Sequence, residues 1–150
     1  MANTNFDMEY PAFLDSLKVG ALGAEADSLV VPDGIVNITP SWDPTVVTYY
    51  KRSGQGFQGG TKTGNAFTIT VESYHISEDA GQKIIAATMF KFGKEAKVAC
   101  EYTFGNGDVL TFNATVKITR MGGGATTDLA PLNYDLICDG KPTFTPAVTE

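Results

Sequence analysis

The clearest structural pattern in the sequence is Val98–Ile118, VACEYTFGNGDVLTFNATVKI. Apolar side chains recur at every second residue on both sides of Gly105–Asp108, from Val98 to Phe104 and from Leu110 to Ile118. This alternation is typical of strands that bury one face. Because Asn-Gly is the strongest short-range signal for a tight turn between two strands, the stretch predicts an antiparallel hairpin. We therefore expect a mainly β domain.

Similar patterns predict further strands on both sides of this hairpin. Residues 66–74 alternate Phe67, Ile69 and Val71 with polar neighbours, and 46–50 are β-branched or aromatic. A turn signal at Asp139–Pro142 separates two C-terminal strands, and another at Asp33–Gly34 precedes a strand. The expected strands are 35–39, 46–50, 66–74, 98–104, 110–118, 132–138 and 143–145. They predict a two-sheet β-sandwich or barrel-like domain.

One α-helix is expected at about 77–92, flanking the sheets. Ser77 is a suitable N-cap, the acidic pair at 78–79 suits the positive end of the helix dipole, and Gly93 can end the helix. Its apolar face is expected to carry Ile84, Ile85, Thr88 and Phe92.

Two segments lack a clear pattern. Residues 1–32 are expected to form an irregular N-terminal arm, in which 13–19 could be a short helix. Residues 51–65 form a long, Gly-rich and basic connection, which we expect to be a loop. At about 15 residues it exceeds ordinary loop lengths, which indicates a functional or mobile segment.

Composition bounds the class of protein. A chain of 150 residues with 43% hydrophobic and 19% charged residues is typical of one soluble domain, 1–150. Met1–Asp7 lacks the basic and apolar regions of a secretory signal, and no apolar run reaches the roughly 20 residues of a membrane span. We expect synthesis in the cytosol, no membrane contact, and Cys100 and Cys138 as buried free thiols.

The sequence contains few arrangements of residues suited to catalysis or ligand binding. We therefore expect no catalytic residue, no cofactor and no metal. Gly54–Gly59 matches the dinucleotide fingerprint GxGxxG, but a strand is expected after it, where the motif needs a helix N-terminus. His75 is the only histidine, and Ser73, Ser77 and Asp79 are too close along the chain to form a triad by default. One histidine and two core-phase cysteines show no metal-ligand spacing. The chain is therefore not expected to be an enzyme.

Charge disfavours nucleic-acid binding. Seventeen acidic and eleven basic residues give a formal net charge of −6. Stable binding to DNA needs clustered Lys and Arg that displace counterions, whereas an acidic surface repels phosphates.

The order of features resembles the major tail (tail tube) proteins of long non-contractile-tailed bacteriophages. The resemblance covers about residues 33–147. It rests on the strand at 35–39, the basic Gly-rich connection, the lone helix with Asp79 and Gln82, the Asn106-Gly107 hairpin, and Leu132–Leu136 running into Asp139–Pro142.

This resemblance implies a structural role. Members of the family form a β-sandwich flanked by one helix and assemble into stacked hexameric rings around a channel for DNA. The partners implied are copies of the chain itself and other phage tail proteins, with DNA passing through without specific binding. The implied location is the virion tail, after synthesis in the host bacterial cytoplasm. The loop 51–65 would contact the next ring, with Lys51, Arg52, Phe57 and Lys62 as contact residues.

A second hypothesis is a β-sandwich module that binds carbohydrate or acts as an adhesin. Trp42, Tyr49, Tyr50 and Tyr74 could supply its stacking surfaces.

Overall fold

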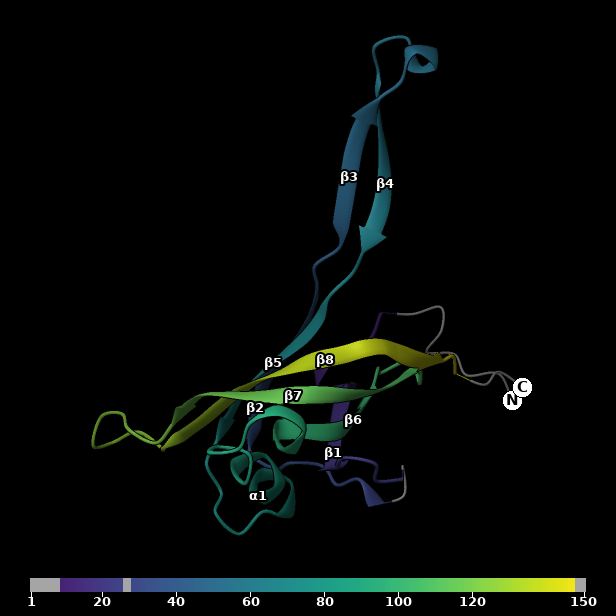
Figure 1. Ribbon diagram of the computed structural model, residues 1–150. Coiled ribbons are helices and arrows are strands. Elements are labelled where there is room, and N and C mark those ends of the chain that lie inside the picture. The colour runs from purple at the N-terminus through teal and green to yellow at the C-terminus, as the bar shows by residue number, and fades with distance from the viewer. Residues whose placement is uncertain (1–8, 26–27, 148–150) are drawn as a thin grey trace.

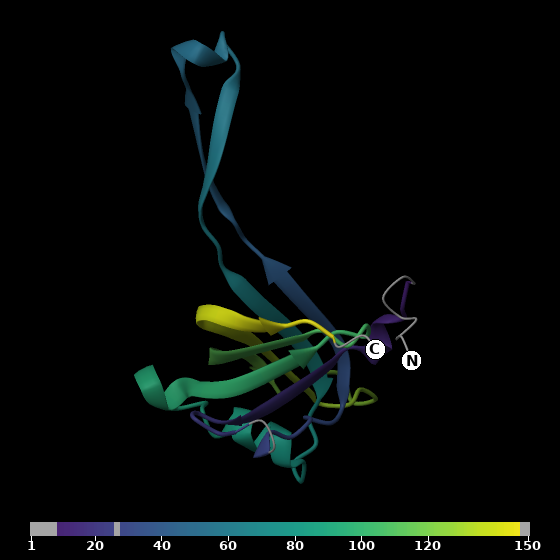
Figure 2. The same cartoon turned by 90° about the vertical axis from the view of Figure 1, so that its right-hand side faces the viewer.

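The chain forms a curled antiparallel sheet from which a long β-hairpin projects (Figures 1 and 2). The computed structural model describes residues 9–25 and 28–147. Six strands make the curled sheet in the order β1-β6-β7-β8-β5-β2, and β3 and β4 make the projecting hairpin. The strands are β1 (Ser16–Ala21), β2 (Ile35–Trp42), β3 (Thr45–Tyr50), β4 (Gln58–Gly64), β5 (Phe67–Tyr74), β6 (Lys97–Thr103), β7 (Val109–Met121) and β8 (Pro131–Thr145). The prediction of a mainly β fold with one α-helix is confirmed.

The hairpin expected at 98–118 is present. β6 and β7 pair antiparallel from Lys97↔Thr115 to Thr103↔Val109. Its turn closes where the Phe104 N–H donates to the Asp108 carbonyl at 2.8 Å, and Gly107 has φ 100°, which a glycine adopts without strain. β7 and β8 extend beyond the expected ends and pair along most of their length.

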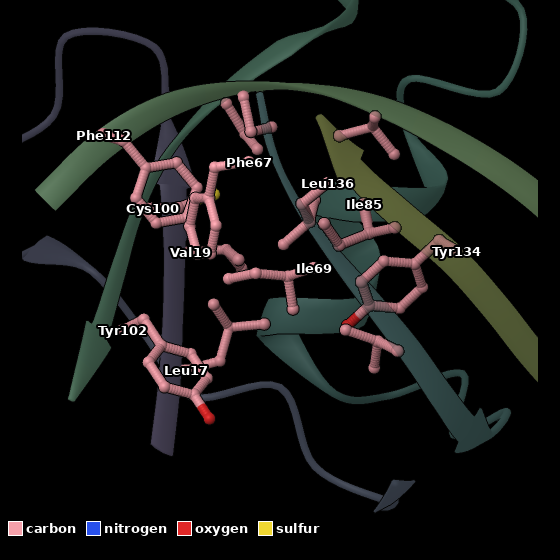
Figure 3. Close-up of a cluster of buried hydrophobic side chains, with 14 of the residues drawn as sticks. Leu17, Val19, Phe67, Ile69, Ile85, Cys100, Tyr102, Phe112, Tyr134 and Leu136 are labelled. Carbon is pink, nitrogen blue, oxygen red and sulfur yellow. The ribbon is translucent and has the colours of Figure 1, made fainter. Parts of the chain in front are cut away.

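The apolar sides of β1, β5, β6, β7 and β8 meet in one core (Figure 3). Ile35 and Ile38 of β2 are partly buried and pack against it. Ile69, Tyr134 and Leu136 are fully buried, and Ile85 reaches them from the helix α1 (Ala80–Ala86). Cys100 lies in this core, and burial raises the pKa of its thiol to about 12. Cys138 is only partly buried, so the expectation of two buried thiols holds for Cys100 alone.

The middle of the N-terminal arm, Ala12–Ala21, is more regular than expected. Ser16–Ala21 forms β1, which pairs with β6 from Ser16↔Thr103 to Ala21↔Val98. Leu17 and Val19 are buried in the core, but two apolar positions are too few to produce a visible alternation in the sequence. A short 3-10 helix at Ala12–Leu14 precedes the strand. The expected arm also includes residues 1–8 and 26–27, which lie outside the described residues.

The helix is shorter than the expected 77–92. Its N-cap is Asp79, not Ser77, and the Asp79 carboxylate accepts from the Gln82 N–H at 2.9 Å. The helix ends at Ala86, after which the chain continues in turns. Ile85 and Thr88 are buried and Ile84 is partly buried, as expected, whereas Phe92 is 87% exposed because the helical phase ends before it.

A buried glutamine ties the helix to the sheet. The Gln82 Oε1 accepts from the Ile76 N–H at 2.7 Å. Its Nε2 donates to the carbonyls of Tyr74 at 2.7 Å and Asp33 at 2.8 Å. These contacts join α1 to the end of β5 and to the segment before β2.

Gln82→Leu should destabilise the domain by about 3 kcal/mol, because it leaves several main-chain groups without partners and each costs about 1–3 kcal/mol when buried. The exposed Gln58 on β4 provides a matched control, since Gln58→Leu removes no buried contact. Urea unfolding measures both. Equal midpoints for the two variants would show that these hydrogen bonds do not hold the helix.

Candidate functional site

The hairpin formed by β3 and β4 is the most unusual feature of the molecule. Within the part of the chain that the structure describes, β3 and β4 pair with each other alone, from Tyr50↔Gln58 at the tip to Thr45↔Gly64 at the base. At the foot, Asp43 and Ala66 exchange two main-chain hydrogen bonds of 2.9 and 3.1 Å, which close the β2–β5 ladder below it. Both views show the hairpin pointing away from the body, on the opposite side from α1 (Figures 1 and 2).

The connection expected as a loop at 51–65 is therefore half of this hairpin. Gln58–Gly64 forms β4, and only Lys51–Phe57 connects the two strands. This strand was not predicted because its small and polar residues, QGGTKTG, lack the apolar alternation of a half-buried strand. It forms because its main chain pairs with β3, whose residues favour strands.

The tip of the hairpin is a compact turn with exposed basic and aromatic side chains. A 3-10 turn at Arg52–Gly54 is followed by Gln55 and Gly56 with φ of 54° and 90°, which reverse the chain. Phe57 is 80% exposed directly after this reversal. The Lys51 ammonium lies 5.2 Å from the centroid of the Tyr49 ring, within range of a cation–π contact.

Three of the four residues expected to make an inter-ring contact lie together at this tip. Lys51, Arg52 and Phe57 all belong to the connection between the strands. Lys62 does not, because it lies on β4 opposite Val46, towards the base.

The exposed sides of the hairpin were not predicted from the sequence, because a β-branched and aromatic run such as 46–50 is typical of a half-buried strand. Val46 and Tyr50 lie on one face and Val47 on the other, since side chains alternate along a strand. Tyr50 is 71% exposed, and both valines are about half-exposed. Tyr49 packs over Gly59, where an added Cβ would lie 2.8 Å from the ring. The signal in the sequence is the unbroken run VVTYY, which places apolar groups on both faces.

Nothing within the described residues packs on the projecting hairpin to stabilise its two strands. An isolated two-stranded hairpin is marginally stable in water and requires a third strand or a packing partner. Within the described residues, neither face of β3 or β4 packs against the buried core. Exposed apolar groups gathered on one element are typical of a protein–protein contact.

Charge is distributed unevenly between the hairpin and the rest of the chain. Thr45–Gly64 contains three basic residues and no acidic one, a net charge of +3. The remaining residues contain eight basic and seventeen acidic residues, a net charge of −9. The hairpin is therefore electrostatically complementary to the body of another copy.

The other candidate groups do not assemble into a reactive site. The Ser73 hydroxyl is buried and donates to the Leu132 carbonyl, and Asp79 caps α1. Gly54–Gly59 leads into β4, so the glycines hold no helix N-terminus towards a phosphate. Across 9–25 and 28–147, no three His, Cys, Asp or Glu side chains group as metal ligands, and no helix is long and apolar enough to cross a membrane.

Solved structures share this fold, although no protein-family model and no curated protein matches the chain. One is a chain in the tail of an empty GTA particle, refined with C6 symmetry (14% identity, TM-score 0.73, covering 92% of this chain and 100% of that one). Another belongs to the virion of a native gene transfer agent particle (12% identity, TM-score 0.69, 92% and 100% covered). A third belongs to the PVC sheath–tube complex of an extracellular contractile injection system in its extended state (13% identity, TM-score 0.55, 99% of both chains covered).

Proposed function

We propose that this chain is the structural subunit of a phage tail tube, in which stacked rings of six copies enclose a channel for DNA. The observation that carries the proposal is the projecting hairpin, which has apolar side chains on both faces and a basic tip. The exposed apolar side chains of such an element become buried when a neighbouring molecule packs against it. The charge of the body makes another copy of the chain the suitable neighbour.

The shared fold supports this proposal. The structures that match over nearly the whole chain include chains from a particle tail, a virion and a sheath–tube complex, and the first was refined with C6 symmetry. Head-to-tail contacts are heterologous, so they close into rings within a layer and extend without limit between layers.

The acidic character suits a conduit and not a DNA-binding protein. A net charge of −6 repels phosphates and keeps passing DNA from adhering to the wall. In this role the chain needs no catalytic group, and its partners are its own copies and other tail proteins. Its place is the virion tail, after synthesis in the host bacterial cytoplasm.

The aromatic residues of the alternative carbohydrate-binding module do not form one platform. Trp42 stacks on Phe67 with ring centroids 4.2 Å apart, at one end of β5. Tyr74 lies at the opposite end of β5, and Tyr49 and Tyr50 lie on the projecting hairpin. No sugar ring can stack on all of them together.

Stacking should weaken as salt is raised, because a basic tip meets an acidic body and exposed charges are screened beyond about 10 Å at 0.1 M salt. We expect long tubes at low ionic strength and shorter tubes or single rings at high ionic strength. Negative-stain electron microscopy across a salt series measures tube length. Tubes whose length does not change across the series would show that charge does not hold the rings together.

A further inference from the structure

The curled sheet leaves an open seam between its two edge strands, β1 and β2. A groove of about 560 Å³ lies along this seam. Its apolar wall comes from β1, β2 and the segments that precede them: Phe13, Leu17, Val31, Ile35, Val36 and Ile38.

The groove is acidic as well as apolar. Asp15 and Asp33 line it, and among the described residues no lysine or arginine does. The Asp15 carboxylate is fixed in place, since it accepts from the Tyr102 hydroxyl at 2.6 Å and the Gly105 N–H at 2.8 Å. Asp33 is exposed. Within the described residues, its carboxylate accepts one hydrogen bond, from the neighbouring Gly34 N–H at 2.7 Å.

The β2 side of the groove is open to a partner. Among the strands of 9–25 and 28–147, β2 pairs with β5 alone, so its outer main-chain groups face the seam. Val36 on this strand is 60% exposed. β1 is less open, because its Val19 bridges Val30 on that side.

We propose that this seam groove receives the hairpin tip of a second copy, an inference that rests on the proposed function and names the surface that its hairpin contacts. Phe57 of one copy packs against the apolar wall around Val36 of the other. Lys51 and Arg52 lie towards Asp33 and Asp15. The contact thus matches an apolar side chain with an apolar wall and two basic groups with two acidic ones.

The occupant is another molecule because the tip cannot reach its own groove. β3 has six residues and spans about 20 Å at roughly 3.3 Å per residue, and in both views it leads away from the body (Figures 1 and 2). Tip and groove are different surfaces of one chain, so each copy can give a tip and receive one. This is the head-to-tail arrangement that extends without limit.

A second groove, of about 620 Å³, is a poorer match. Trp42, Phe104 and Phe144 line it, but so does Lys141, and none of its lining residues is acidic. A lysine in this position repels the basic tip. The groove also includes Asn65 and Ala66 at the foot of the hairpin, on the side of the body from which the hairpin leaves.

Site-specific cross-linking between two tagged forms of the full chain tests the contact. One form carries Ser53→Cys in the exposed tip and the other Val36→Cys in the groove, and the two are assembled together and treated with a short bismaleimide. We expect a cross-linked heterodimer. Pairing Ser53→Cys with Phe144→Cys, in the second groove, is the matched control and should give little product. Tubes that cross-link only through Phe144→Cys would overturn this docking site and leave the proposed function standing, whereas absence of any assembly would overturn both.

A charge swap tests the same contact without cysteines. Asp33→Lys should abolish tubes while leaving the melting temperature nearly unchanged, because its side chain is exposed. Adding only Lys51→Glu to the same chain should restore tubes, since attraction returns at this pair with reversed signs while Arg52 still faces Asp15. A double variant that assembles no better than Asp33→Lys would contradict the pairing of tip and groove.

Discussion

Replacing Pro44–Asn65 with a two-residue Asn-Gly turn is expected to leave the domain folded and to abolish tubes entirely. The fold survives because Asp43 and Ala66 already form a doubly hydrogen-bonded pair, which is the geometry that a two-residue turn closes. None of the core residues lies between them. Assembly is lost because the element that bridges two copies is gone. Thermal unfolding and electron microscopy of the same preparation give both results.

A second variant keeps the length of the hairpin and removes most of its charge, so it measures the effect of charge alone. Lys51→Gln combined with Arg52→Gln keeps every strand but removes two of the three positive charges. Its tubes should be shorter than those of the parent chain, not absent, since Phe57 and the apolar flanks remain. Long tubes from the truncated chain would show that the hairpin is not the stacking element.

Ile85→Asp is expected to have the largest effect on stability. Ile85 is fully buried and extends from α1 into the core beside Leu136 and Tyr134 (Figure 3). A carboxylate at this position has no cationic partner in the core, and an unpaired buried charge costs at least about 4 kcal/mol. For a domain of ordinary stability of about 5–15 kcal/mol, that loss unfolds much or all of the population.

Phe92→Asp is the matched control for this variant. Like Ile85, Phe92 was expected on the apolar face of the helix, yet its side chain is exposed. Its replacement should therefore change the free energy of unfolding by less than about 0.5 kcal/mol. Circular dichroism melts of both proteins decide the matter. A folded Ile85→Asp protein with an unchanged melting temperature would show that α1 does not dock through this residue.

Strands with one buried face were predictable from the sequence, and elements without such a face were not. Val98–Ile118 and 66–74 alternate clearly because each has a core on one side and solvent on the other. β4 has no core on either side, so its glycines and threonines gave only the pattern of a loop. Its pairing with β3 depends on main-chain hydrogen bonds, which are independent of side-chain type.

The limits of the helix were mispredicted for a related reason. The sequence allows a long helix, from the cap at Ser77 to Gly93. The start of the helix is instead fixed by the Gln82 side chain, which hydrogen-bonds to the main chain of Tyr74, Ile76 and Asp33. Contacts between residues up to 49 positions apart in the chain are not visible in a local pattern. All four candidate contact residues were expected in one loop, and Lys51, Arg52 and Phe57 do lie in the connection between the strands. Lys62 lies on β4 instead, because strand pairing is not visible in a local pattern. Their contact with a neighbouring ring stays a prediction.

A reconstruction by electron cryo-microscopy of tubes assembled from the purified chain tests whether the hairpins join stacked rings. We expect stacked rings of six subunits in which each hairpin extends from its own ring onto the body of a subunit in the next ring. A chain that stays monomeric at every concentration and ionic strength, or tubes in which the hairpins point freely into solvent, would contradict it.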